Sequence, residues 1–165
     1  VSLAGGKLPA KLPPDLCLTG VDLRKPCEAQ LKALAAWEQR RSALEAAGVA
    51  LWFVSVIGES VADAQLARFK SDPGSRGKTC RAGLWGYSRH PNYFFEWLVW
   101  CAYALFALAS PWGFVALACP ALMLFFLLRV TGIPATEAQS LRTKGDDYRE
   151  YQRTTSPFVP WFRKS

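Results

Sequence analysis

Apolar residues are concentrated in one long run, from Trp97 to Leu128, which holds 32 residues without Asp, Glu, Lys or Arg. A membrane-spanning helix needs about 20 predominantly apolar residues. The sequence S-P-W-G at 110–113 interrupts this run, and Pro91 precedes it in a position suited to the first turn of a helix. The pattern therefore predicts a hairpin of two apolar helices, at 91–109 and 114–128.

A second apolar stretch, residues 46–58, contains 13 residues and is shorter than a span requires. A helix here crosses a bilayer only if it includes Glu59 and Asp63, which lie four residues apart on one helical face. Acidic side chains at membrane depth are costly and usually face a cavity or a partner. Alternatively, the helix leaves the bilayer near Gly58 and both acids are interfacial. These two interpretations remain open.

The segment that precedes these helices is more polar. Residues 1–26 are rich in Pro and Gly and are expected to be irregular, whereas 27–45 has helical spacing and a polar composition. We therefore divide the chain into an unassigned N-terminal segment, 1–45, and a membrane domain, 46–165.

The remaining segments are a loop and an amphipathic tail. Residues 71–87 contain four glycines and a proline and predict a loop. Thr136 and Gln139 fit a capping box, which predicts a cytoplasmic helix at 137–153. The aromatic and basic end, 156–165, is typical of a membrane-interface belt. The predicted fold class is all-α, an integral membrane helical bundle with a hairpin and a C-terminal amphipathic helix.

Composition and charge agree with a membrane protein. Hydrophobic residues make up 51% of the 165 residues, charged residues 20%, and the net charge is +7. Lys and Arg are concentrated at 68–89 and 129–164 and are absent from the S-P-W-G turn. By the positive-inside rule, the loop at 71–89 and the C-terminus are expected to be cytoplasmic. The membrane would be the endoplasmic reticulum in a eukaryote and the inner membrane in a bacterium. Because the basic residues flank apolar runs, we do not expect a nucleic-acid partner.

The motifs of several other protein classes are missing. The five cysteines form no C-x-x-C pair and there is one histidine, so neither a zinc site nor a disulfide framework is expected. G-S-R-G-K-T at 74–79 lacks the glycine spacing of a phosphate-binding loop. No metal is therefore expected.

The densest polar cluster in an apolar setting is Y-S-R-H-P-N-Y-F-F-E at 87–96. Arg89 and His90 stand just before a helix N-terminus, where free N–H groups and the helix dipole favour an anion. Asn92, Tyr93 and Glu96 follow within a turn and a half, so the cluster predicts a site for a charged cofactor at the membrane surface. The alternative is that these are ordinary residues flanking a spanning helix.

Three motifs in order carry a resemblance to a known family. They are G-L-W-G-Y-S-R-H-P-N-Y-F-F-E-W at 83–97, preceded by E-S-V-A-D-A-Q-L-A-R-F-K at 59–70, and G-I-P-A-T-E at 132–137 with Y-R-E-Y-Q-R-T-T-S-P-F-V-P-W at 148–161. Together they resemble uncharacterised membrane proteins related to the steroid 5-alpha reductases, over about residues 50–162.

The resemblance implies a membrane-bound oxidoreductase that uses NADPH to reduce a carbon–carbon double bond in a steroid-like or isoprenoid lipid. It leaves the catalytic residues unknown. The cofactor-binding residues that it implies are Asp63, Lys70, Arg89, His90, Asn92, Tyr93, Glu96, Tyr148, Arg149, Tyr151 and Arg153. Among these, Lys70, Arg149 and Arg153 would meet the phosphates.

This chain departs from the family in two places. Phe95 stands where the family usually has Gly, and a bulky ring there would obstruct a cofactor or a neighbouring helix. The reductases also carry earlier spanning helices, which supply a Glu and a Tyr to the substrate carbonyl, and residues 1–45 do not resemble them.

Two alternatives to the reductase remain. R-H-P-N-Y at 89–93, the later Glu137 and Y-x-x-Y at 148–151 also resemble isoprenylcysteine carboxyl methyltransferases, which bind S-adenosylmethionine. The other alternative is a non-catalytic membrane fragment.

Overall fold

A computed structural model describes residues 28–110 and 112–163. The predicted irregular segment, 1–26, lies outside the described residues, as do Cys17, Cys27 and Pro111. The chain divides into two compact units, 1–38 and 39–165, and of the first unit only residues 28–38 are described.

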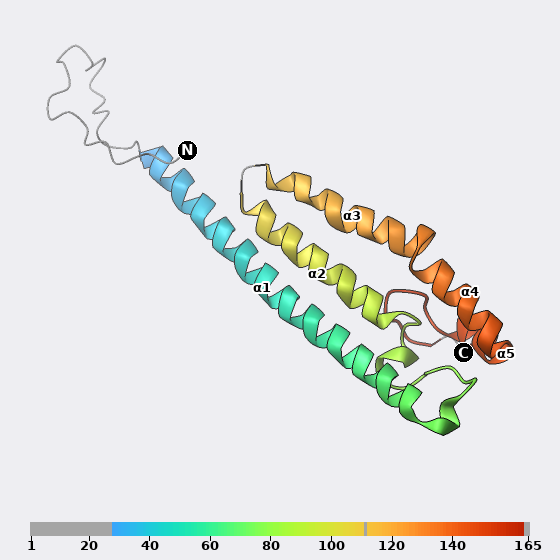
Figure 1. The fold of residues 1–165 in the computed structure, drawn as a ribbon. Helices are drawn as coiled ribbons and strands as arrows, with labels where there is room; N and C mark the ends of the chain where they lie inside the picture. The colour runs from blue at the N-terminus through green and yellow to red at the C-terminus, as the bar shows by residue number, and fades with distance from the viewer. Residues whose placement is uncertain (1–27, 111, 164–165) are drawn as a thin grey trace, which may run out of the picture. The chain divides into compact units, whose positions relative to one another are not determined.

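The described residues form helices and no β-strand, in agreement with the predicted all-α class (Figure 1). The elements are α1 (Glu28–Ser71), η3 (Pro73–Ser75), η4 (Gly83–Gly86), α2 (Pro91–Leu108), η5 (Gly113–Leu117), α3 (Ala118–Phe125), η6 (Phe126–Val130), α4 (Ile133–Lys144) and α5 (Asp146–Thr154). Of these, η3, η4 and η5 are 3₁₀ turns and η6 is a π-helical turn.

Two helical segments are long and apolar enough to cross a membrane, Ala35–Ser71 and Gly113–Lys144. The polar helix predicted at 27–45 and the apolar stretch at 46–58 belong to one continuous helix, α1. Glu59 and Asp63 lie in the second half of this helix, several residues before its end. The predicted first arm of the hairpin, α2, is not among the candidate spans, because polar residues such as Asn92 and Glu96 occupy its first two turns.

The predicted hairpin is present. Pro91 lies in the first turn of α2, as expected, and α2 packs along η5 and α3, which run antiparallel beside it (Figure 1). The turn between them needs a glycine, because a Cβ on Gly113 would lie 1.7 Å from the carbonyl oxygen of Ala107. Farther along, the indole Nε1 of Trp97 donates a hydrogen bond of 3.0 Å to the carbonyl of Pro120 and joins the two arms.

The helices α1 and α2 approach each other closely where α1 has glycine. A Cβ on Gly58 would lie 2.4 Å from the ring of Phe95, and one on Gly48 would lie 3.1 Å from Phe106. The absent side chain of Gly58 thus makes room for the bulky residue at position 95. The Trp85 indole, from η4, also donates a hydrogen bond of 2.9 Å to the Ala62 carbonyl of α1.

The prediction of a single C-terminal helix at 137–153 is wrong in two respects. The helix α4 already begins at Ile133, with Pro134 in its first turn, so Thr136 lies inside it and donates to the Gly132 carbonyl instead of capping. Gly145, with φ of +55° and ψ of −123°, then separates α4 from α5, because non-glycine residues rarely adopt that conformation.

Candidate functional site

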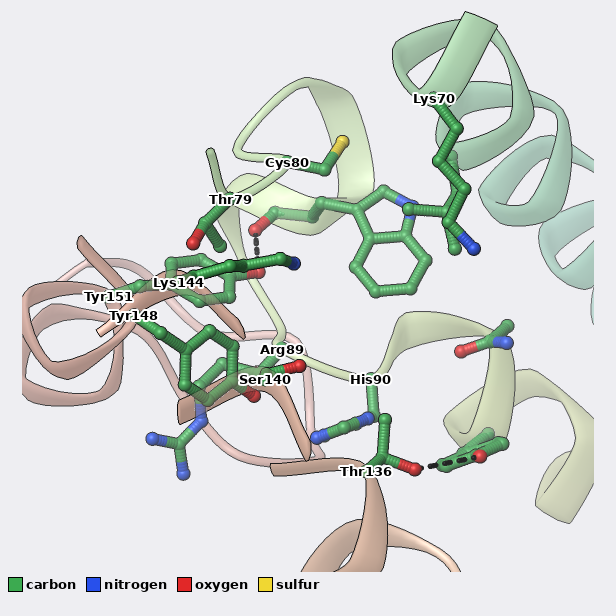
Figure 2. A pocket seen from close by; sticks show the side chains of 14 residues that line it. Lys70, Thr79, Cys80, Arg89, His90, Thr136, Ser140, Lys144, Tyr148 and Tyr151 are labelled. Atoms are coloured by element: carbon green, nitrogen blue, oxygen red, sulfur yellow. Dashed lines mark hydrogen bonds between the residues drawn. The ribbon is translucent and has the colours of Figure 1, made fainter. Parts of the chain in front are cut away.

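A cavity of about 270 Å³ lies where α1, α2, α4, α5 and the segment 79–90 meet (Figure 2). It is lined by Leu66, Lys70, Thr79, Cys80, Trp85, Arg89, His90, Asn92, Tyr93, Thr136, Ser140, Lys144, Tyr148 and Tyr151. The walls come from residues up to 85 positions apart in sequence, so only the tertiary fold assembles this site.

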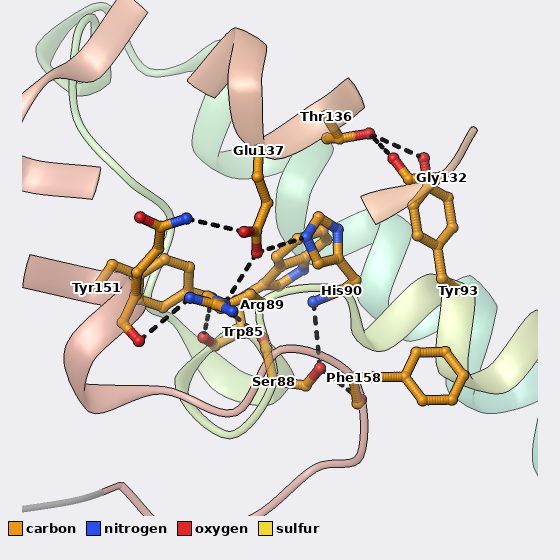
Figure 3. A network of polar contacts seen from close by, with 11 residues as sticks. Trp85, Ser88, Arg89, His90, Tyr93, Gly132, Thr136, Glu137, Tyr151 and Phe158 are labelled. Atoms are coloured by element: carbon orange, nitrogen blue, oxygen red, sulfur yellow. Dashed lines mark hydrogen bonds and ion pairs between the residues drawn. The ribbon is translucent and has the colours of Figure 1, made fainter. Parts of the chain in front are cut away.

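One wall of the cavity is organised by the carboxylate of Glu137 (Figure 3). Its Oε1 lies 3.0 Å from Arg89 Nε in an ion pair and 3.3 Å from His90 Nε2, and its Oε2 accepts a hydrogen bond of 2.8 Å from the Gln152 amide. The side chains of Arg89, His90 and Glu137 are 10%, 4% and 15% exposed. Water therefore screens the Arg89–Glu137 ion pair little, and the hydrogen bonds and ion pair of Glu137 hold Arg89 and His90 in place.

The position of His90 is set by its backbone and by its ring. Its N–H donates to Ser88 Oγ, which in turn donates to the Phe158 carbonyl at 2.7 Å. The imidazole stacks on the Tyr93 ring, with the ring centroids 5.4 Å apart and the planes 5° from parallel. The Tyr93 hydroxyl lies 3.3 Å from Thr136 Oγ1, and this contact ties α2 to α4.

Two tyrosines of α5, Tyr148 and Tyr151, also line the cavity. The Tyr151 hydroxyl lies within hydrogen-bond distance of the carbonyl oxygens of Trp85 and Ser88, and so connects α5 to the segment that carries Arg89. Burial raises the pKa of the Tyr151 phenol well above its ordinary value, and that of Tyr148 likewise, where the charge of Glu137 adds to the effect. Both phenols therefore remain neutral at physiological pH.

Basic side chains line the cavity, whereas Glu137 contacts Arg89 and His90 but is not itself a lining residue. Lys70 extends toward the cavity from α1 and Lys144 from α4, and none of the described lining residues is Asp or Glu. A neighbouring cavity of about 240 Å³ shares Leu66, Lys70 and Lys144 and adds Arg76 and Lys78. The hydroxyl oxygen of Thr79 is buried without a hydrogen-bond partner.

The segment that carries Thr79 is fixed to α5 by Asp147. The Thr79 N–H donates to Asp147 Oδ2 at 2.7 Å, and Arg81 Nη2 donates to Oδ1 at 3.1 Å. Partial burial raises the pKa of Asp147, but Thr79 and Arg81 outweigh it and leave the pKa below its usual value. These contacts hold Arg81 in place at this edge of the cavity.

The structure brings seven of the eleven predicted cofactor residues to the cavity. They are Lys70, Arg89, His90, Asn92, Tyr93, Tyr148 and Tyr151. Asp63, on α1, and Glu96, on α2, do not line it. Arg149 and Arg153 are exposed and pair with Asp146 and Glu150 within α5.

The sequence interpretation did not assign Thr136, Ser140 and Lys144 to the site, although they recur every four residues and so share one face of α4. Glu137 belongs to the G-I-P-A-T-E motif of the reductase resemblance and was named singly in the methyltransferase resemblance, but it was not assigned to the cofactor site. No pattern in the sequence marks Thr79, Cys80 or Trp85 as cavity residues.

Between residues 28 and 163, Pro111 excepted, no group of three or more His, Cys, Asp or Glu side chains is placed to hold a metal ion. Cys80, Cys101 and Cys119 are free thiols.

Comparison with protein families places most of the chain in a family. The model of the family described as "Protein of unknown function (DUF1295)" matches residues 28–155. No curated protein and no solved structure matches the chain.

Proposed function

The chain belongs to the DUF1295 family, and from the chemistry of its cavity we propose that it is a membrane-bound reductase that binds NADPH there. The cofactor, the reaction and the membrane location are all parts of this proposal. Its relation to the steroid 5-alpha reductases rests on the motifs at 59–70, 83–97 and 132–161.

The exposure of the apolar helices supports the membrane location. In each candidate span only 11% of the most apolar 18-residue window is buried, whereas a core helix of a soluble protein is mostly buried. Large apolar side chains such as Ile57, Phe114 and Leu122 are more than half exposed. Lipid would cover these surfaces, with the loop at 71–89 and the C-terminus on the cytoplasmic side.

The observation that carries the choice of cofactor is the charge of the cavity. Lys70 and Lys144 line it together, Arg76 and Lys78 line the adjoining cavity, and no described lining residue is acidic. NADPH carries a pyrophosphate and a 2′-phosphate, which such cations stabilise. S-adenosylmethionine carries a sulfonium cation and no phosphate, so the same lining disfavours it.

The residues present fit a dinucleotide in other respects as well. The unpartnered Thr79 hydroxyl, the Asn92 amide and the neutral Tyr148 phenol are uncharged hydrogen-bond groups. Arg89 and His90 are held by Glu137, so they shape the wall and are not free to move toward a ligand. When bound, NADPH supplies a hydride, and the chain's part is to bind, orient and exclude water.

The acceptor in this proposal is an unsaturated lipid, steroid-like or isoprenoid. This class follows from the family resemblance and from the apolar exterior of α1 and α2, along which such a molecule would approach. Phe95 does not obstruct the cavity, because its ring packs over Gly58 instead.

The test is a parallel titration of NADPH and S-adenosylmethionine into detergent-purified protein, read by energy transfer from tryptophan to reduced nicotinamide and by calorimetry. We expect NADPH alone to bind. Lys144→Gln should weaken it by about 10- to 100-fold, the range for a charged hydrogen bond. Arg142→Gln, an exposed change two residues away on the same helix, should leave affinity unchanged.

The other outcomes are equally informative. Binding of S-adenosylmethionine alone would move the chain to the methyltransferases. Binding of neither would favour a non-catalytic role, and an equal effect of the two variants would remove Lys144 from the site.

A further inference from the structure

A second hollow, of about 460 Å³, shares no lining residue with the cofactor cavity. It is lined by Arg81, Gly83, Gly86, Tyr87 and Arg163. Two guanidinium groups thus border one space, with two residues that have no side chain, and none of the described lining residues is acidic. Guanidinium groups suit phosphate oxygens, to which they donate charge-assisted hydrogen bonds.

Arg81 is held rigidly at one side of this hollow. Its Nη2 donates to the carbonyl oxygen of Asp147 at 2.9 Å and to Oδ1 at 3.1 Å, and its guanidinium carbon lies 5.8 Å above the Tyr151 ring. Its Nε is buried and has no hydrogen-bond partner. Because these contacts already order the side chain, a ligand that reaches it loses little conformational entropy.

The chain segment that carries Arg163 is also fixed. The Trp161 N–H donates to the Tyr87 carbonyl at 3.0 Å, and the rings of Tyr87 and Phe162 meet edge to face with centroids 6.3 Å apart. The two arginines therefore border the hollow because the tail is bonded to the turn after η4, and not through a chance approach of long side chains.

The tail that carries Arg163 exposes large apolar side chains. Trp161 is 65% exposed, Phe162 76% and Val159 51%. Exposed aromatic rings beside cations are typical of the boundary between headgroups and acyl chains. A soluble phosphate would account for the arginines but would leave these rings in water.

We propose that this hollow binds the phosphate headgroup of an anionic phospholipid, with Trp161 and Phe162 inserted at the level of the headgroups. The ligand would fix the tail against η4 and, through Arg81 and Asp147, stabilise the Thr79 edge of the cofactor cavity. The inference rests on the membrane location proposed above, but not on the identity of the cofactor.

The experiment measures thermal unfolding of the full chain in phosphatidylcholine nanodiscs, with and without added phosphatidylglycerol. We expect phosphatidylglycerol to raise the melting temperature by about 2–4 °C. Arg163→Gln should lose most of that rise, whereas Arg142→Gln, which removes the same charge from an exposed position of α4, should keep it.

A third arm adds inorganic phosphate to phosphatidylcholine nanodiscs and should not reproduce the rise. The proposal is overturned if phosphate alone reproduces it, if both variants lose it equally, or if phosphatidylglycerol has no effect. NADPH affinity, measured on the same samples, reports the cofactor proposal separately. Failure of the chain to enter phosphatidylcholine nanodiscs would overturn the membrane location and this inference with it.

Discussion

The two ends of the α2–α3 hairpin are built on opposite principles. At the end near the S-P-W-G turn, large apolar side chains face outward: Trp112 is 78% exposed and Phe114 58%. At the other end, polar side chains face inward: Ser88, His90 and Thr155 are buried, and Tyr151 is 1% exposed although it carries a hydroxyl. In the apolar part of the hairpin, Trp97 donates one hydrogen bond from α2 to α3. At the polar end, several hydrogen bonds of Glu137 and Tyr151 connect the helices and the loop segment.

The difference shows which interactions stabilise each region. The apolar end depends on a solvent that covers its side chains, as a lipid bilayer does. The polar end depends on internal hydrogen bonds, and buried polar groups are expensive when they lose a partner. Mutations at the polar end should therefore lower the free energy of unfolding strongly. Elsewhere the effect of a mutation should depend on how closely the helices pack at that position.

The largest effect is expected from Glu137→Ala. Removing this carboxylate leaves Arg89 buried without a counter-charge and removes partners of His90 and Gln152. The free energy of unfolding should fall by about 3–5 kcal/mol, measured by denaturant unfolding in detergent micelles.

The matched control is Glu150→Ala, because Glu150 pairs with Arg153 at an exposed position of α5. It should change the free energy of unfolding by no more than about 1 kcal/mol. Equal losses for the two variants would contradict the picture of a buried network at the polar end.

Gly58→Leu tests packing between α1 and α2. Because a Cβ at this position already meets the Phe95 ring at 2.4 Å, a larger side chain should cost about 1–3 kcal/mol of stability. The double variant with Phe95→Ala should recover part of the loss, since it removes the obstructing ring. Strictly additive losses in this double-mutant cycle would show that the two residues do not pack together.

Tyr151→Phe removes only a hydroxyl from a buried ring. The carbonyl oxygens of Trp85 and Ser88 lose their donor, so the free energy of unfolding should fall by about 1–2 kcal/mol. Tyr103→Phe, on α2, is the control, because Tyr103 is 49% exposed and its change should be close to neutral. A neutral Tyr151→Phe would mean that water replaces this contact.

The smallest effect concerns pH. The pKa of Asp147 is lowered in the folded state, so its contribution to stability is present above the unfolded value of about 3.9 and is lost as pH falls through the folded value. At pH 7, Asp147→Asn should lower the melting temperature by no more than about 2 °C. The gap between variant and wild type should narrow as pH falls below the unfolded value, and a gap independent of pH would contradict the ionised Thr79–Asp147–Arg81 contact.

Local signals predicted much of the secondary structure. Proline in the first turn places the start of α2 at Pro91, and the apolar run divided at S-P-W-G predicts the hairpin, because both depend on nearby residues only. The polar cluster around Arg89 and His90 likewise marked the position of the cavity. Local signals failed where a glycine competed with helical periodicity, as at Gly145, which divides the predicted C-terminal helix.

By itself, the sequence of this protein determined its helical class, its apolar segments and the excess of basic residues near the site. Only the tertiary structure decided that Glu137 holds Arg89 and His90, that Gly58 accommodates Phe95, and that Lys70 and Lys144 line one cavity. The physical reason is range. Helix propensity and hydrophobic patterning act over a few residues, whereas these contacts join residues 37 to 74 positions apart and exist only after the helices pack.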